Sequence, residues 1–117
     1  MPCKNLINYA QGCSLLIHEA TFADGFEQDA LVKKHTTISQ ALQLIDQVKP
    51  WRSILTHFSV RNQKGPQILD KHLNKKTMVA FDHLRIKLSD LKWAYKLMPL
   101  FQHIFQEESE GNDEPKD

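Results

Sequence analysis

The sequence predicts an α/β protein in which short strands alternate with helices. Two apolar runs, at 14–18 and 53–57, each end in a histidine, and such short runs are typical of buried strands. A third run, 78–88, alternates apolar and polar residues as a half-buried strand does. Helical periodicity fills the segments between these runs, so the pattern predicts helices layered on a sheet.

The helix with the strongest apolar stripe is expected at 40–48. Ser39 is its expected N-cap, and Pro50 prevents its continuation. A first helix is expected at 3–11, where Gly12 follows as a C-terminal signal. The remaining helical segments are two short ones and a longer one that Pro99 starts or kinks, at 26–34, 67–74 and 91–105.

Charge divides the chain into a body and a tail. Residues 107–117 hold six acidic side chains and one lysine and lack large apolar residues, so we expect one domain over 1–106 and an acidic disordered tail at 107–117. The body is mildly basic, which suits a nucleic-acid partner but does not require one. No apolar run approaches the roughly 20 residues that cross a bilayer, and we expect an intracellular protein.

The predicted sheet has few strands for the kind of strand it contains. Two of the three strands read as buried on both faces, and such strands need more neighbours than three strands supply. The pattern therefore indicates part of a larger fold.

Ionisable side chains follow the strands at positions suited to a functional site. His18, Glu19 and His57 lie where an apolar run meets a loop, and His35 lies in the connection between them. A single histidine at such a place is more often structural, and the chain has no closely spaced pair of metal ligands. An HExxH metalloprotease helix is excluded because position 22 is Phe22. The residues alone thus indicate scattered members of a site that other segments complete.

Four motifs in a fixed order resemble the C-terminal part of tRNase Z in its long eukaryotic form, the zinc-dependent endoribonuclease that trims the 3′ ends of tRNA precursors. They are His18-Glu19-Ala20-Thr21-Phe22, His35-Thr36-Thr37, Thr56-His57-Phe58-Ser59-Val60-Arg61 and Ala80-Phe81-Asp82-His83. The resemblance spans residues 1–90, and it implies the C-terminal half of a metallo-β-lactamase-type αββα sandwich. It further implies two zinc ions, a precursor tRNA substrate, and a place in the nucleus, the mitochondrion or both.

The resemblance also implies roles for individual residues. His57 matches the last zinc ligand, and Glu19 with His35 matches a pair that delivers a proton to the leaving 3′ oxygen. A carboxylate hydrogen-bonded to an imidazole favours its charged form and fixes its orientation, so Glu19 would make His35 a competent acid. The resemblance further implies that Ser59 and Arg61 contact substrate phosphate, and that Asp82 makes a supporting contact near the metal.

The chain departs from the family pattern in two ways. Thr36 stands for a serine, and Asn62 for a tyrosine. The HxHxDH motif, a further histidine and a bridging aspartate would all precede Met1.

Two hypotheses follow. The chain is either the C-terminal portion of the endoribonuclease, inactive alone because most metal ligands are missing, or a non-catalytic half-fold that acts as an assembly or weak RNA-binding module. A homodimer or a complementing N-terminal half would then complete the fold.

Overall fold

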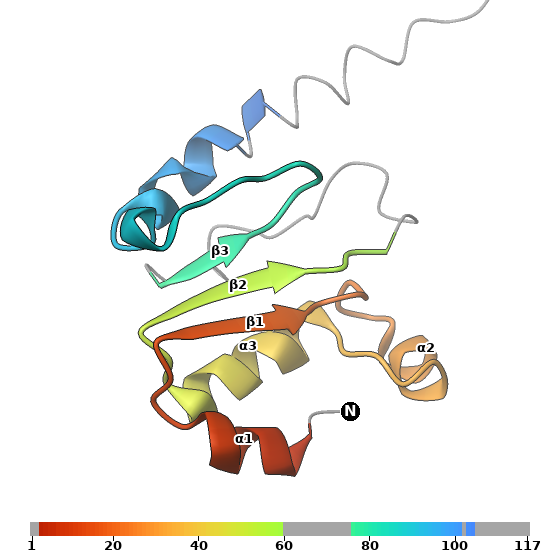
Figure 1. The fold of residues 1–117 in the computed structure, drawn as a ribbon. Coiled ribbons are helices and arrows are strands. Elements are labelled where there is room, and N and C mark those ends of the chain that lie inside the picture. The colour runs from red at the N-terminus through yellow and green to blue at the C-terminus, as the bar shows by residue number, and fades with distance from the viewer. Residues whose placement is uncertain (1–2, 60–75, 102, 105–117) are drawn as a thin grey trace, which may run out of the picture.

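A three-stranded parallel sheet lies at the centre of the chain. The computed structural model describes residues 3–59, 76–101 and 103–104. Strands β1 (Leu15–Glu19), β2 (Arg52–Thr56) and β3 (Thr77–Val79) lie side by side in chain order (Figure 1). Because all three run parallel, the carboxyl ends of β1 and β2 open toward the same edge of the sheet.

The turns that precede β1 and β2 are bonded to each other. The backbone N–H of Trp51 donates to the carbonyl of Cys13 at 2.9 Å, and that of Arg52 donates to the carbonyl of Ser14 at 3.1 Å. The two strands therefore start together, and their register pairs Leu15 with Arg52 and Glu19 with Thr56. Both strands lie one residue from the expected bounds, so β1 ends at Glu19 rather than at His18.

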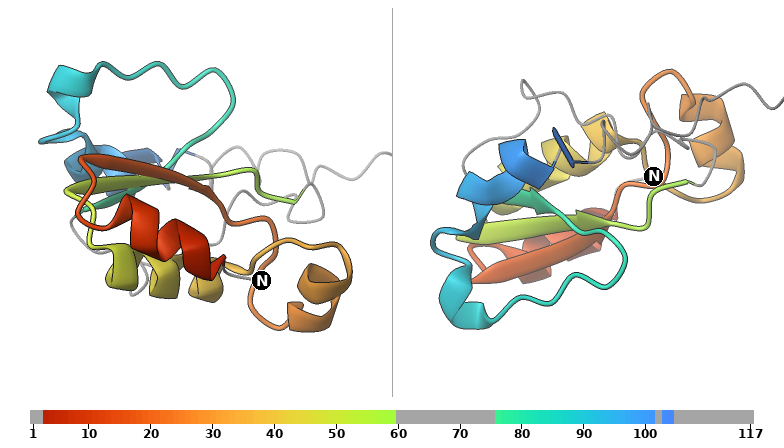
Figure 2. Two further views of the ribbon diagram at one scale, coloured as in Figure 1. Left: turned by 60° about the horizontal axis from the view of Figure 1, so that its bottom comes forward. Right: turned by 90° about the horizontal axis from the view of Figure 1, so that it is seen from above.

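Two helices lie together beside β1. Helix α1 (Lys4–Ala10) ends before Gly12, whose φ of 66° gives the left-handed turn that glycine adopts without strain. Helix α3 (Ile38–Val48) lies against α1 and β1, whereas α2 (Glu27–Val32) stands apart near the carboxyl edge (Figures 1 and 2). The three helices confirm the expected alternation with strands.

The start of α3 corrects the expected N-cap. Thr37, not Ser39, caps the helix: its hydroxyl accepts the N–H of Gln40 at 3.3 Å, and the Gln40 side chain accepts the N–H of Thr37 at 3.1 Å. This reciprocal pair is a capping box. Ser39 instead donates its N–H and its hydroxyl to Asp24.

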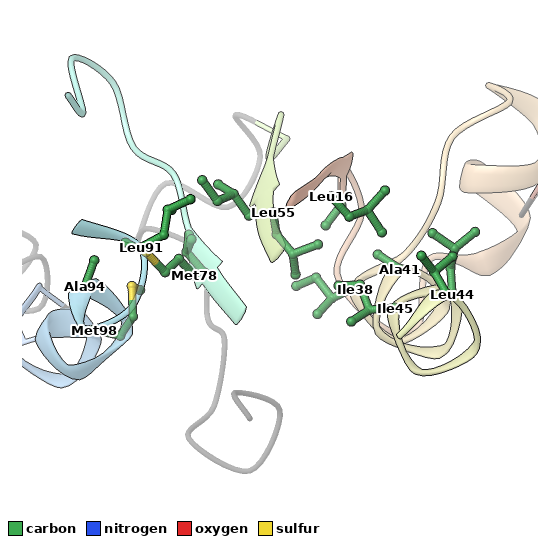
Figure 3. Packing of buried hydrophobic residues seen from close by; sticks show 14 residues of the cluster. Leu16, Ile38, Ala41, Leu44, Ile45, Leu55, Met78, Leu91, Ala94 and Met98 are labelled. Carbon is green, nitrogen blue, oxygen red and sulfur yellow. The ribbon is translucent and has the colours of Figure 1, made fainter. Parts of the chain in front are cut away.

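The hydrophobic core extends along both sides of the central strand (Figure 3). Leu55 on β2 lies between two groups of buried side chains. One group joins β1 to α3, and the other joins β3 to the C-terminal segment; they are Leu16, Ile38, Ala41, Leu44 and Ile45, and Met78, Leu91, Ala94 and Met98. The apolar stripe predicted for α3 is thus the face that packs against the sheet.

The C-terminal third differs most from expectation. Strand β3 covers three residues instead of 78–88, because the chain turns at Asp82 and His83 with a φ of 66° at His83. The expected helix 91–105 is broken into shorter pieces. Two 3-10 helices, η2 (Leu88–Asp90) and η3 (Ala94–Leu97), precede a helical stretch over 98–101, with Pro99 in its first turn as expected.

Arg52 fastens this segment to the central strand. Its guanidinium lies over the rings of Trp51 and Tyr95, 4.3 and 5.3 Å from their centroids. It also donates to the carbonyl of Leu91 at 2.9 Å and to that of Lys92 at 3.2 Å. One side chain therefore satisfies carbonyl groups that the short helical pieces leave without helical partners.

The expected loop 60–66, the helix 67–74 and the acidic tail 107–117 lie outside the described residues. Within the described ranges, no helix has the length and apolar character needed to span a membrane.

Candidate functional site

Three loops meet at the carboxyl edge of the sheet. The segment after β1 bonds to the end of β2, since the N–H of Ala20 donates to the carbonyl of Thr56 at 2.9 Å. The segment after β2 returns this contact through the N–H of Ser59, which donates to the carbonyl of Thr21 at 2.8 Å. Phe22 pairs with Thr37 in a parallel bridge, which brings the entry to α3 to the same place.

Glu19 is the anchor of this junction. Its Oε2 accepts the N–H of Thr21 at 3.0 Å and the Thr21 hydroxyl at 2.6 Å. Its Oε1 accepts the N–H of Thr36 at 2.6 Å and the Thr36 hydroxyl at 2.7 Å. The carboxylate therefore ties the loop after β1 to the loop before α3, and each oxygen is held by a donor pair.

These contacts decide the charge of Glu19. Partial burial raises the pKa of the Glu19 carboxyl, but the hydroxyls of Thr21 and Thr36 and then their backbone N–H groups lower it, and the net pKa is below the ordinary 4.5. Donors aimed at a carboxylate stabilise its charged form. Glu19 is consequently an anion near neutral pH and not a proton donor.

His35 lies beside this carboxylate. Its backbone N–H donates to the carbonyl of Ala30 at the end of α2, at 2.8 Å, after a left-handed turn through Lys34 with a φ of 59°. The His35 Nδ1 atom is 3.7 Å from the Glu19 Oε2 atom, an ion-pair distance, and 3.4 Å from the Thr21 hydroxyl oxygen. The expected direct hydrogen bond between Glu19 and His35 is therefore replaced by a contact that runs past Thr21.

His57 is a ring neighbour of His35. It follows the last residue of β2, it is exposed, and its φ of 61° turns the chain sharply away from the strand. The His35 and His57 ring centroids are 5.3 Å apart with a tilt of 36°. Sequence reasoning thus named three side chains, Glu19, His35 and His57, that the structure brings together.

The described part of the chain does not by itself make a zinc site. No group of three or more histidine, cysteine, aspartate or glutamate side chains suited to a metal ion occurs there. Protein zinc sites use three or four such ligands. His57, with His35 as its histidine neighbour, does not fit that requirement, so we assign no chemical step to a metal.

The other predicted site residues are placed differently. Ser59 joins the junction through its backbone N–H. Asp82 is exposed in the turn after β3. Arg61 lies outside the described residues.

The two threonines were not predicted as parts of the site. Thr21 and Thr36 are 8% and 3% exposed, and both donate to Glu19. A hydroxyl two residues after a glutamate is a signal of local side-chain bonding, because short hydroxyl side chains often bond nearby groups. The contact of Thr36 with Glu19 spans 17 positions and has no such local signal.

This α/β sheet, with its junction of loops at the carboxyl edge, is of the metallo-β-lactamase type. The chain superposes on the crystal structure of a long-form RNase Z from yeast with a TM-score of 0.71 and 33% identity, over 90% of this chain and 14% of that one. No family model matches the sequence.

Similar sequences carry a consistent name. The Drosophila melanogaster protein "Ribonuclease Z, mitochondrial" is 36% identical over 110 residues, 94% of this chain and 14% of that protein. A Caenorhabditis elegans protein named "Zinc phosphodiesterase ELAC protein 2 homolog" is 39% identical over 105 residues, 89% of this chain and 12% of that protein. Over most of its length, the chain is homologous to a segment of proteins named tRNase Z or ribonuclease Z, and its structure matches a long-form RNase Z.

The matches cover most of this chain but only a small part of each relative. The chain spans between 11% and 14% of the length of the curated relatives that it matches. Several relatives are named as mitochondrial and others as zinc phosphodiesterases, so zinc dependence and a mitochondrial setting occur within the family.

Proposed function

We propose that the chain forms the part of a tRNA 3′-processing endoribonuclease that delivers a proton to the leaving 3′ oxygen. The parent reaction would be hydrolysis of the phosphodiester at the 3′ trailer of a precursor tRNA. Support comes from one observation above all: the Glu19 carboxylate and the His35 imidazole lie 3.7 Å apart in a chain related to ribonuclease Z.

The proton balance assigns different roles to the two side chains. Water adds to phosphorus and releases one proton to solvent, the bond between phosphorus and the 3′ oxygen breaks, and that oxygen leaves with the bonding electron pair. His35, as the imidazolium, gives its proton to this oxygen, which becomes the 3′-hydroxyl, and solvent returns a proton to the ring. Glu19 stays ionised, because its lowered pKa suits an anion that holds an imidazolium.

The remaining site roles rest on the family. We propose His57 as a ligand of one of two zinc ions in the complete enzyme, with the other ligands outside the described residues. Ser59 and Arg61 would contact substrate phosphate, and Asp82 would support the site. The substrate would be a precursor tRNA in the mitochondrion, the nucleus or both.

A graft into a complete enzyme tests the proposal. The 117-residue sequence replaces the matching segment of the yeast long-form RNase Z, and cleavage of a precursor tRNA is measured in single turnovers. We expect trailer release by the graft and a loss of about 10²- to 10⁴-fold in His35→Ala, the range that general acids contribute. Glu19→Gln should lower the rate as well, because the ring loses its anionic partner.

The matched control is His103→Ala, which removes an exposed histidine of the C-terminal segment. It should cleave at the rate of the unaltered graft. A His35→Ala graft that cleaves as fast as the His103→Ala graft would refute the proposed role of His35.

An assembly role is the second candidate, and Ile17 favours it. Ile17, Ile54 and Met78 occupy one face of the sheet by register, and Ile54 and Met78 are buried. Ile17 is 61% exposed on β1, at the edge of the described sheet. An apolar side chain left open on an edge strand suits a surface that another polypeptide covers.

A further inference from the structure

We propose that Thr21 is a positioning residue whose hydroxyl links Glu19 to His35 and fixes the Nδ1–H tautomer of the His35 ring. This inference rests on the proposed function for its catalytic meaning. Its structural content, the protonation pattern of one ring, can be measured without any cleavage assay.

The direction of the first hydrogen bond follows from its partners. A hydroxyl carries a single proton, and the ionised Glu19 carboxylate has none to give. The 2.6 Å contact between the Thr21 hydroxyl and the Glu19 Oε2 atom must therefore use the Thr21 proton. The hydroxyl oxygen then has only lone pairs to offer to any other neighbour.

The direction of the second contact follows from the first. The His35 Nδ1 atom lies 3.4 Å from the Thr21 oxygen, a long contact that is favourable only if Nδ1 carries a hydrogen. The negatively charged Glu19 Oε2 atom, 3.7 Å from the same nitrogen, favours the same arrangement, though more weakly because that distance is too long for a hydrogen bond. Both neighbours thus select Nδ1–H, and the proton exchanged with substrate is the one on Nε2.

The surroundings of Thr21 make it a firm link. It is 8% exposed, its N–H also donates to Glu19 Oε2, and its carbonyl accepts the N–H of Ser59. The hydroxyl is therefore held in place by the loops that follow β1 and β2. Thr36 donates to the other carboxylate oxygen, Oε1, so Thr36 provides a matched comparison.

Ring tautomers can be read from nitrogen-15 shifts of the imidazole. The full 117-residue chain, labelled at histidine, is measured in alkaline solution, where the ring is neutral. We expect His35 to be in the Nδ1–H form in the unaltered chain and in Thr21→Ser, which keeps the hydroxyl. Thr21→Val keeps the shape but removes the hydroxyl, and it should give a mixture of tautomers. Thr36→Val should leave the His35 tautomer unchanged.

Three results would overturn the inference. They are an Nε2–H tautomer in the unaltered chain, a single Nδ1–H tautomer that persists in Thr21→Val, and a Thr36→Val variant that mixes tautomers as Thr21→Val does. The first needs no variant, so the inference can be tested even if Thr21→Val does not fold.

The graft into the yeast enzyme adds the catalytic measurement. Thr21→Val should lower kcat about tenfold with little change in KM, because it displaces the proton donor without removing a substrate contact. Thr21→Ser should restore most of kcat. If His35→Ala has no effect in the graft while the tautomer results hold, the proposed function fails and the hydroxyl link stands. If His35→Ala is inactive but the tautomer results fail, the reverse is true.

Discussion

At the scale of single residues, Glu19 links the stability of the fold to pH. Its folded-state pKa is lowered relative to an ordinary value of 4.5, so the native chain holds this proton less tightly than the unfolded chain does. The resulting stabilisation is present above the unfolded pKa and is lost as pH falls through the lowered, folded one. Acid should therefore weaken the contact between the loop after β1 and the loop before α3.

Urea unfolding at pH 6 and at about pH 3.5 measures this linkage. The free energy of unfolding should fall toward low pH, and it should fall less in Glu19→Gln, whose amide does not titrate. Glu27→Gln, at an exposed position on α2, is the control and should keep the pH dependence of the unaltered chain. Equal slopes for Glu19→Gln and the unaltered chain would contradict the assignment.

Some residues of the site could be predicted from the sequence and others could not. Glu19, His35 and His57 could be found because each is an ionisable side chain in a recognisable motif, and Glu19 and His57 also lie at strand ends. The position of Thr21 between Glu19 and His35 could not be predicted. It depends on two distances from the His35 Nδ1 atom, 3.4 Å to the Thr21 hydroxyl oxygen and 3.7 Å to the Glu19 Oε2 atom. These distances are set by the register of two strands and by three loops, which no local pattern encodes.

At the scale of elements, the capping box of α3 connects helix stability to the site. Thr37 begins the helix and also forms the bridge to Phe22, and Thr36 next to it holds Glu19. Fraying of the first turn of α3 would therefore loosen the loop that carries His35.

Thr37→Ala should lower the free energy of unfolding by about 1 kcal/mol, the usual cost of removing an N-cap side chain. Ser39→Ala, at the position that the sequence favoured as the cap, should cost less, because its bonds to Asp24 are exposed. Chemical denaturation of both variants decides the order. A larger loss for Ser39→Ala would show that the cap lies where the sequence placed it.

Elements were predictable where burial and periodicity agree. The apolar stripe of α3 and the apolar runs of β1 and β2 gave these elements within one or two residues, although Ile17 on β1 is exposed rather than buried. The alternating run after Val79 gave a wrong prediction of a long strand, because Ile86 packs against the core from a segment that is not part of β3. Alternation reports which side chains are buried, and it does not require a hydrogen-bonded partner strand.

At the scale of the whole molecule, the described residues fold around one hydrophobic core. They bring Glu19 and His35 to within 3.7 Å of each other and hold the C-terminal segment through Arg52. They do not supply a metal site, and Ile17 stays exposed. Completion by a second copy or by the remainder of a long-form enzyme remains a prediction.

We expect the purified 117-residue chain to release no trailer from a precursor tRNA, because the described residues hold no complete set of metal ligands. The measurement is a single-turnover assay with excess chain and added zinc, with the grafted yeast enzyme as the positive control. Trailer release by the chain alone at a rate near that of the graft would refute this expectation.

The bonded turns before β1 and β2 determine which residue of the chain lies at the end of β1. Five positions separate Ser14, whose carbonyl is held by Arg52, from Glu19 at the strand end. Successive side chains of a strand point to opposite faces, so one residue inserted after Ser14 would move His18 into the place of Glu19 and Glu19 to the opposite face. Such an insertion keeps every amino acid of the motif and still replaces the anion beside His35 with a second imidazole. The number of residues between the turn at Ser14 and the end of β1 therefore matters to the site as much as the identity of the side chains does.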